Sequence, residues 1–163
     1  MTIYNAYEVW ALYEKNSEQA KNNIKDIEVF CGKEPHFAGL NGWVFEQTIR
    51  YCITREHEAL GVNLKIDEQV SLGGRAKADL QIGNILIELK TSGLFGLGDV
   101  EKYQRYKKLA YDKQYSRYLY LTWNETHIPY KHGLDDALGK ENIFYLEEDG
   151  EWERFITVTC STP

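Results

Sequence analysis

Asp79 and the triplet Glu88-Leu89-Lys90 are the residues whose types and spacing suit chemistry. They flank a Gly-Asn pair at 83–84, which favours a two-residue hairpin turn with a positive φ at the glycine. With that pair as the loop, the two strands bring Asp79 directly opposite Glu88. Like charges in such a pair are destabilising, with Cβ atoms roughly 5 Å apart. A cation held between the carboxylates would remove the repulsion, so the spacing predicts a metal site.

A charged pair that simply faces water is the alternative interpretation of the same residues. Along 85–90, three aliphatic residues alternate with Leu86, Glu88 and Lys90. One face of the expected strand is therefore fully apolar, and the other is partly apolar. Charges at the end of such a strand favour a cleft at the sheet edge over open solvent. The hairpin pattern alone leaves both interpretations open.

The elements that must position these residues follow from periodicity and from helix and strand breakers. We expect helices over 3–30, with a break near Asn16-Ser17, over 42–59 after a loop at 32–41, and from a cap at Asp99 to about 113. Strands are expected at about 64–71, 75–82, 85–91, 116–123, 142–147 and 152–159, the last two joined as a hairpin at Asp149-Gly150. This order predicts an α/β fold with a mixed central sheet flanked by helices. The strand at 116–123 arrives through a helical crossover and should pair parallel to an earlier strand.

Composition and cysteine usage limit the class of protein. The chain has 163 residues, 43% hydrophobic and 27% charged, which is typical of a single globular domain. No stretch approaches the roughly eighteen apolar residues that span a bilayer, and we expect neither a signal peptide nor a membrane partner. Cys31, Cys52 and Cys160 are widely spaced and form no CxxC pair. They predict free thiols in a reducing compartment, and therefore a cytoplasmic protein.

The net charge of −6 argues against a strongly basic surface, which nucleic-acid binding favours. Its distribution is uneven, however. Between Asp99 and Arg117, six basic residues face three acidic ones, a local net of +3. Acidic residues gather instead at 147–153. The basic segment predicts either one positive face or an ordinary solvated amphipathic helix.

Asp79, followed on the next strand by Glu88-x-Lys90, resembles the signature of the PD-(D/E)xK nuclease superfamily. The expected order of elements resembles that family's restriction-endonuclease-like αβββαβ core, over residues 42–123. Glu46 stands alone as an acid in the helical segment Gly42-Trp43-Val44-Phe45-Glu46-Gln47, where members of the family often carry a further acidic residue. Ala78 replaces the proline of the family's name, a position without a chemical duty.

The resemblance implies a Mg²⁺ cofactor, for which Mn²⁺ can substitute, bound by Asp79, Glu88, the backbone carbonyl of Leu89 and Glu46. Carboxylate oxygens are ligands that Mg²⁺ prefers. It further implies that Lys90 orients or helps deprotonate the attacking water and stabilises charge on the phosphate. For Glu46, the alternative is a surface residue paired with Arg50 one helical turn later.

Two residues of the following helix, Gln104 and Lys107, are implied as candidates for substrate binding. For Gln104, an exposed helix residue is the competing interpretation. His127 and His132, in an expected loop, and the Gly93–Gly98 loop, an expected flexible lip, stay outside the predicted catalytic set. The Gly93–Gly98 loop lacks the pattern of a P-loop.

The resulting expectation is a single nuclease domain over 1–163, with a helical extension at 1–40, a catalytic core at 42–123 and a C-terminal β-hairpin at 140–160. Its expected activity is that of a Mg²⁺-dependent DNA endonuclease of restriction, repair or junction-resolving type. Cutting both strands with one site per chain would favour a homodimer, or a partner subunit could supply affinity for DNA. The alternative is a catalytically inactive DNA-binding or protein-interaction module with the same fold.

Overall fold

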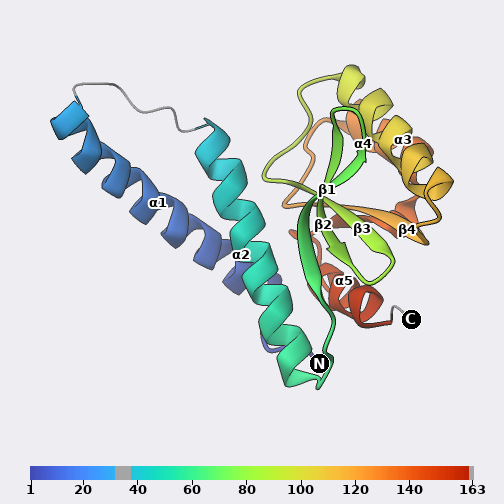
Figure 1. Ribbon diagram of the computed structural model, residues 1–163, viewed down its shortest axis with the longest axis horizontal. Coiled ribbons are helices and arrows are strands. Elements are labelled where there is room, and N and C mark those ends of the chain that lie inside the picture. The colour runs from blue at the N-terminus through green and yellow to red at the C-terminus, as the bar shows by residue number, and fades with distance from the viewer. Residues whose placement is uncertain (32–37, 162–163) are drawn as a thin grey trace.

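The computed structural model describes the backbone of residues 1–31 and 38–161, and the side chains of 1–25 and 39–161. This part of the chain forms an α/β fold with a five-stranded mixed sheet and five α-helices (Figure 1). The helices are α1 (Ala6–Cys31), α2 (Ala38–Ala59), α3 (Leu97–Asp112), α4 (Ile128–Leu138) and α5 (Glu151–Cys160), with a short 3₁₀ helix η1 (Lys140–Asn142). The strands are β1 (Ile66–Gly73), β2 (Ala76–Ile82), β3 (Ile85–Lys90), β4 (Arg117–Thr122) and β5 (Ile143–Tyr145).

The sheet has the strand order β1-β2-β3-β4-β5. The first three strands form an antiparallel meander, whereas β4 pairs parallel to β3 and β5 pairs parallel to β4. The predicted mixed sheet is therefore confirmed, as is the parallel arrival of the 116–123 strand after a helix. Each parallel connection runs through helical segments, as the geometry of parallel strands requires.

Helices cover both faces of the sheet, which makes three layers (Figure 1). The helices α1, α2 and α5 pack on the face that receives Ile85, Ile87 and Leu89 of β3. The helices α3 and α4 pack on the other face, which receives Leu86. The alternation of side chains along β3 thus feeds two hydrophobic cores, because successive strand residues point to opposite faces. Within the described ranges, no helix is long and apolar enough to cross a membrane.

The β2–β3 hairpin turns at Gly83, which has a φ of +56° as the Gly-Asn turn predicts. The ladder pairs Ile82 with Ile85 and ends at Leu80 opposite Ile87. The predicted next pair, Asp79 opposite Glu88, lies beyond the end of this ladder. Where the ladder stops, the amide of Leu89 donates a hydrogen bond to the Asp79 carboxylate. The two strands therefore part at the residues predicted to carry the chemistry.

The predicted break of the first helix near Asn16-Ser17 is wrong, because α1 runs through both residues without interruption. Both side chains contact α2 instead. The Ser17 hydroxyl donates to Asn41 Oδ1 (2.7 Å), and Asn16 Nδ2 donates to Thr48 Oγ1 (3.4 Å). Polar residues that suggested a break thus join two helices. Of the predicted loop at 32–41, residues 38–41 already belong to α2, and 32–37 lie outside the described residues.

The predicted C-terminal β-hairpin is wrong. Residues 143–145 form β5 as expected, but 152–159 belong to helix α5. Gly150, with a φ of +79°, precedes this helix rather than closing a hairpin turn. The buried residues of α5 follow a helical spacing of i, i+3, i+4 and i+7: Trp152, Phe155, Ile156 and Thr159.

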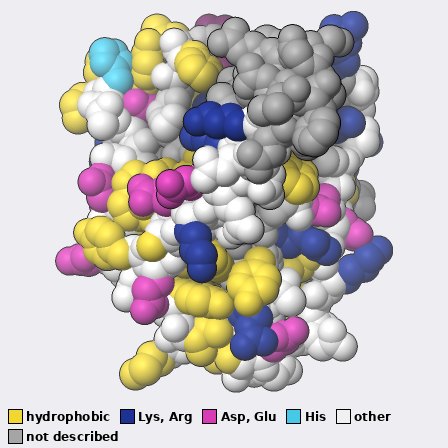
Figure 2. Space-filling view, turned by 90° about the vertical axis from the view of Figure 1, so that its left-hand side faces the viewer, with side chains coloured by type: hydrophobic (Ala, Val, Ile, Leu, Met, Phe, Trp, Pro, Cys, Tyr) yellow, Lys and Arg dark blue, Asp and Glu magenta, His cyan; other side chains and the backbone are white. Residues whose placement is uncertain are grey.

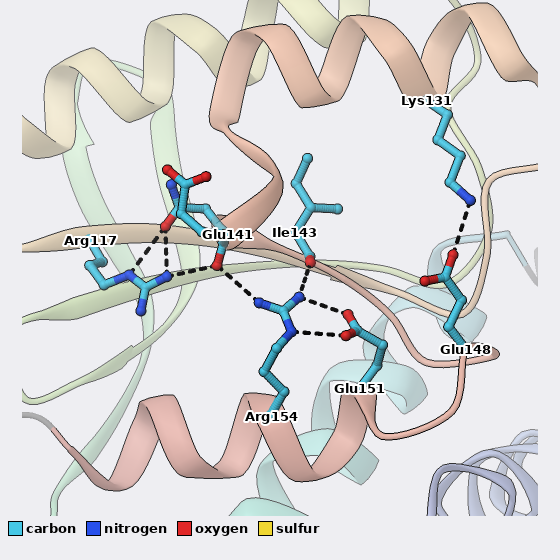
Figure 3. Close-up of polar contacts among 8 residues, drawn as sticks. Arg117, Lys131, Glu141, Ile143, Glu148, Glu151 and Arg154 are labelled. Atoms are coloured by element: carbon cyan, nitrogen blue, oxygen red, sulfur yellow. Dashed lines mark hydrogen bonds and ion pairs between the residues drawn. The ribbon is translucent and has the colours of Figure 1, made fainter.

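Arg154 connects α5 to the end of the sheet (Figure 3). Its guanidinium donates to both carboxylate oxygens of Glu151 (2.7 and 2.8 Å), to the carbonyl of Glu141 (3.1 Å) and to the carbonyl of Ile143. Arg117 of β4 donates to the same Glu141 carbonyl (2.8 Å). Paired charged hydrogen bonds of this kind are stronger than neutral ones. They fix α5 as a helix against η1 and β5.

Two further boundaries differ from the prediction. Residues 127–132 were expected as a loop, but α4 begins at Ile128, so that His127 precedes a helix and His132 lies within it. Asp99 does not cap α3, because the helix begins at Leu97 after Gly96. Instead the Asp99 carboxylate, in the first turn, accepts a hydrogen bond from the amide of Phe95 (2.9 Å). An acidic residue at this position satisfies an amide of the preceding loop and suits the positive end of the helix.

Candidate active site

Asp79 stands at the centre of the candidate site. One of its oxygens accepts the amide hydrogen of Leu89 (2.8 Å), and the other accepts a hydrogen bond from Gln69 Nε2 (3.3 Å). Burial raises the pKa of Asp79, while these donors act in the opposite direction. The backbone of Leu89, which was predicted to offer its carbonyl to a metal, therefore lies directly beside Asp79.

Gln69 of β1 holds two of the carboxylates together, and sequence reasoning missed it. Its Nε2 lies 3.2 Å from Glu46 Oε2 and 3.3 Å from Asp79 Oδ1. Its φ of +50° is uncommon for a residue with a side chain. The β1–β2 ladder contains the pairs 68–80 and 70–78 but skips 69–79. Unusual backbone conformation of this kind clusters at functional sites. Its position opposite Asp79 could have identified Gln69 as a site residue, but that position follows only from the β1–β2 register, which the sequence does not specify.

Glu46 of α2 lies on the Asp79 side of its helix. Its pKa is raised to about 8, first by burial and then by the nearby charge of Asp79. The alternative partner, Arg50, approaches Glu68 instead, with 3.9 Å between Nε and Oε2. The structure therefore brings Glu46 and Asp79 together, although they are 33 residues apart in the chain.

Glu88 of β3 is the most enclosed of the three carboxylates, with 8% of its surface exposed. The Tyr118 hydroxyl donates to its Oε2 (3.3 Å). Burial and the charge of Asp79 raise its pKa well above the ordinary value, whereas the ammonium of Lys102 on α3 acts to lower it. Neither Tyr118 nor Lys102 was among the predicted site residues. Lys102 was visible only as one of several basic residues on its helix.

Glu46, Asp79 and Glu88 thus form a cluster in which each carboxyl has a raised pKa. Such a cluster takes up either protons or a cation, because adjacent buried negative charges are unfavourable. Its hard oxygen donors are of the type that Mg²⁺ selects, so the donor set fits this ion. In the described residues, no three acidic, histidine or cysteine side chains already surround a common metal position.

Lys90 ends β3, two residues beyond Glu88. Its Nζ lies 3.9 Å from Asp99 Oδ2 and 4.6 Å from the centre of the Phe95 ring. This places the ammonium between β3 and the loop that leads into α3. The predicted role beside the scissile phosphate would require it to leave Asp99.

The structure does not bring Gln104 and Lys107 to the carboxylates. Both line a separate groove between α3 and α4, with Tyr111 and Ala137. Lys107 Nζ donates to the carbonyl of Leu138 (3.0 Å). On α3 it is Lys102, two residues before Gln104, that acts on Glu88. Gln104 and Lys107 point in other directions, because each successive helical position turns the side chain by about 100°.

Comparisons with known proteins give no relative from which a function could be transferred: no family model, no curated protein and no solved structure matches this chain.

Proposed function

We propose that this protein is a Mg²⁺-dependent DNA endonuclease with a restriction-endonuclease-like core. The observation that carries the proposal is the cluster of Glu46, Asp79 and Glu88 at the point where β2 and β3 part. The order α2, β1, β2, β3, α3, β4 supports it, because the helix, meander, helix and strand follow one another as in the expected αβββαβ core. Restriction, repair and junction-resolving enzymes are all compatible with this site.

Asp79 and Glu88 would hold the metal, with the Leu89 carbonyl and Glu46 as further ligands. When bound, Mg²⁺ or Mn²⁺ would neutralise charge on the phosphate and activate the attacking water. Gln69 keeps Glu46 beside Asp79, and the Tyr118 hydroxyl fixes one oxygen of Glu88. The chain thus pre-orients the acidic groups before any substrate arrives.

Lys90 supplies the positive charge that the proposed chemistry needs. In an extended strand, residues two apart point to the same face, so Lys90 shares the face of Glu88. Its ammonium would turn from Asp99 to a phosphate oxygen and stabilise the charge that develops during hydrolysis. The ion pair between Lys90 and Asp99, at 3.9 Å between partly exposed groups, is weak. The ammonium can therefore leave Asp99 for the phosphate at little cost in free energy.

The test is a cleavage assay on supercoiled, linear, branched and single-stranded DNA with Mg²⁺, Mn²⁺ or EDTA. We expect cleavage with either metal and none with EDTA. Asp79→Asn and Lys90→Ala should each reduce the rate by roughly 100-fold or more. Asp67→Asn and Lys65→Ala are matched controls, since these two residues form an exposed ion pair (2.9 Å) outside the cluster. Metal-dependent cleavage that persists in the Asp79 variant would rule out this site.

A catalytically inactive DNA-binding or protein-interaction module is the second candidate. Two observations favour it: both Asp79 oxygens are already occupied by protein donors, and Lys90 pairs with Asp99. The described part of the α1–α2 side also mixes acidic, basic and hydrophobic side chains instead of forming one basic face (Figure 2). DNA binding without cleavage of any substrate in either metal would favour this module over the enzyme.

A further inference from the structure

A groove of about 540 Å³ opens beside the candidate site, where β3 meets the first turns of α1 and α2. Trp10 and Tyr13 of α1, Gly42 of α2, and Lys90 and Phe95 contribute to its walls. This volume lies within the range of sites that bind small organic groups. The groove adjoins the carboxylate cluster, because Leu89, whose amide donates to Asp79, is part of its lining.

Phe95 is the unusual residue of this groove. It is 89% exposed, although phenylalanine is normally buried. The loop backbone at this residue is held by two carboxylates: the amide of Leu94 donates to buried Glu125 (2.6 Å), and the amide of Phe95 donates to Asp99 (2.9 Å). The Lys90 ammonium lies over its ring. An exposed aromatic ring beside a cation is available to contact a ligand.

The opposite wall is also aromatic and is rigidly packed. Trp10 stacks on Trp123 with 4.8 Å between ring centres, and it contacts Tyr13 at 4.7 Å. Tyr13 in turn packs edge-on against buried Phe45 (5.4 Å). Rings held in this way offer contact area at little cost in conformational entropy.

The charge of the groove separates it from the others on this molecule. Among the described residues that line it, Lys90 is the single charged one. The groove between α3 and α4 carries both signs of charge, with three basic and two acidic side chains, and the one bordered by α4 and α5 carries three basic and four acidic ones. On a chain of net charge −6, an aromatic groove with a lone cation suits an anionic ligand with a flat apolar part.

We infer that this groove receives an unpaired nucleotide of the DNA strand that enters the site, with its base against the aromatic side chains and its phosphate near Lys90. The inference rests on the proposed function, since it assigns the form of DNA that the same site accepts. Every base has a face that can stack on an aromatic ring, so the groove would tolerate any sequence. A fully paired duplex keeps its base faces stacked within itself and cannot fill the groove.

Binding in EDTA tests the inference independently of cleavage. The probes are fluorescently labelled oligonucleotides: a single strand, its blunt duplex, and the same duplex with a gap. We expect the single strand and the gapped duplex to bind more tightly than the blunt duplex. Phe95→Ala should weaken binding of the first two by roughly 5- to 150-fold, the effect of losing one stacked base, while Phe95→Trp retains it. A 2-aminopurine at the unpaired position should lose fluorescence on binding, and should do so less with Phe95→Ala.

Leu97→Ala is the matched control, because Leu97 is also apolar and exposed but is not among the described residues of the groove. Its variant should bind like the original protein. Equal binding by Phe95→Ala, equal affinity for the blunt duplex, or no binding to any probe would each overturn the inference. Metal-dependent cleavage with no effect of Phe95→Ala would leave the nuclease standing without the groove. Binding that depends on Phe95 but is never followed by cleavage would leave the groove standing without the nuclease.

Discussion

At the scale of single residues, the candidate site gathers carboxylates that are electrostatically unfavourable beside one another. The charge of Asp79 raises the pKa of both Glu46 and Glu88, and Gln69 adopts an uncommon backbone conformation while it bonds Glu46 and Asp79. Stability alone gives no reason to gather three acids in this way, because replacing such groups by apolar ones often stabilises a protein. The proposed metal ion would offset this unfavourable arrangement.

If Glu46 is a ligand of the proposed metal, metal binding should depend on pH. Its pKa rises from an ordinary 4.5 to about 8 in the folded protein. A raised folded pKa contributes stability below the unfolded value and loses it as pH rises toward 8, so the metal-free protein should become less stable over this window. Mg²⁺ must displace the proton, and its stabilising effect should therefore grow from pH 6.5 to pH 8.5.

Thermal unfolding with Mg²⁺ or EDTA across this pH range measures the effect. Glu46→Gln should flatten the pH dependence of the Mg²⁺-induced rise in Tm, because the amide does not titrate. Glu14→Gln, an exposed acid on α1, should leave the dependence unchanged. An identical rise in Tm at pH 6.5 and pH 8.5 would contradict the assignment of Glu46 to the metal site.

Gln69 allows its backbone strain to be separated from its hydrogen bonds. Gln69→Ala removes the bonds to Glu46 and Asp79 but keeps a side chain at φ +50°, whereas Gln69→Gly also removes the strain. We expect the glycine variant to be more stable than the alanine variant by about 1 kcal/mol. Urea unfolding in EDTA gives both free energies. If alanine were the more stable replacement, the left-handed conformation of this residue would be in doubt.

At the scale of elements, the loop between β3 and α3 positions both Lys90 and Phe95, and a close contact holds it. The buried Glu125 carboxylate accepts the amides of Leu94 (2.6 Å) and His127 (3.0 Å). A Cβ atom placed on Gly93 would lie 2.5 Å from an oxygen of that carboxylate. The glycine is therefore required by the approach of Glu125 to the loop backbone.

Gly93→Ala should displace Glu125 and destabilise the protein by about 1–3 kcal/mol, since a buried carboxylate would lose its donors. Gly98→Ala provides the comparison within the same segment, because nothing lies within 4 Å of its added Cβ atom. Gly98 is helical, so alanine there should be neutral or stabilising by up to about 1 kcal/mol. Chemical denaturation of both variants tests the pair. Equal stabilities would show that Glu125 can move aside without cost.

Sequence patterns predicted the elements that depend on local rules and missed those that depend on distant partners. The β2–β3 register followed from Gly83 because a two-residue turn fixes the pairing of its strands. Helix α5 was predicted as a strand because Asp149-Gly150 locally favours a hairpin turn. Burial at helical spacing and the bonds of Arg154 override that preference.

The same difference between local patterns and distant partners applies to the residues of the candidate site. Asp79, Glu88 and Lys90 could be predicted from their spacing on one hairpin, and Glu46 from a resemblance. Gln69 could not, because its role depends on a φ of +50° that no sequence pattern specifies. Gln104 was a candidate for substrate binding by resemblance, with an exposed helix residue as the alternative, because the phase of a helix is set by how it docks on the sheet.

At the scale of the whole molecule, one buried carboxylate joins both ends of the described chain to α2. Glu56 is fully buried. It accepts hydrogen bonds from the amides of Ile3 and Tyr4 (both 2.9 Å) and from Trp152 Nε1 (3.0 Å). Its partners lie 52, 53 and 96 residues away in sequence, which explains why no local pattern indicated them. The same carboxylate thus fixes the start of α1 and the docking of α5 on the far side of the sheet from α3.

Glu56→Gln should therefore remove a large part of the free energy of unfolding of the whole fold, and should not loosen one element alone. Its amide nitrogen would face N–H donors, and the charge that strengthens three hydrogen bonds would be lost, so we expect about 3 kcal/mol or more. Glu58→Gln, two residues later, removes an exposed carboxylate bonded to Arg55 and should change stability by less than about 0.5 kcal/mol.

Urea unfolding followed by the fluorescence of buried Trp152 and by circular dichroism measures the stability of both variants. Coincident transitions at a lower urea midpoint are expected for Glu56→Gln, because loss of this carboxylate loosens α1, α2 and α5 together. Separate transitions would show that the α1–α2 pair unfolds independently of the sheet and that Glu56 does not couple them.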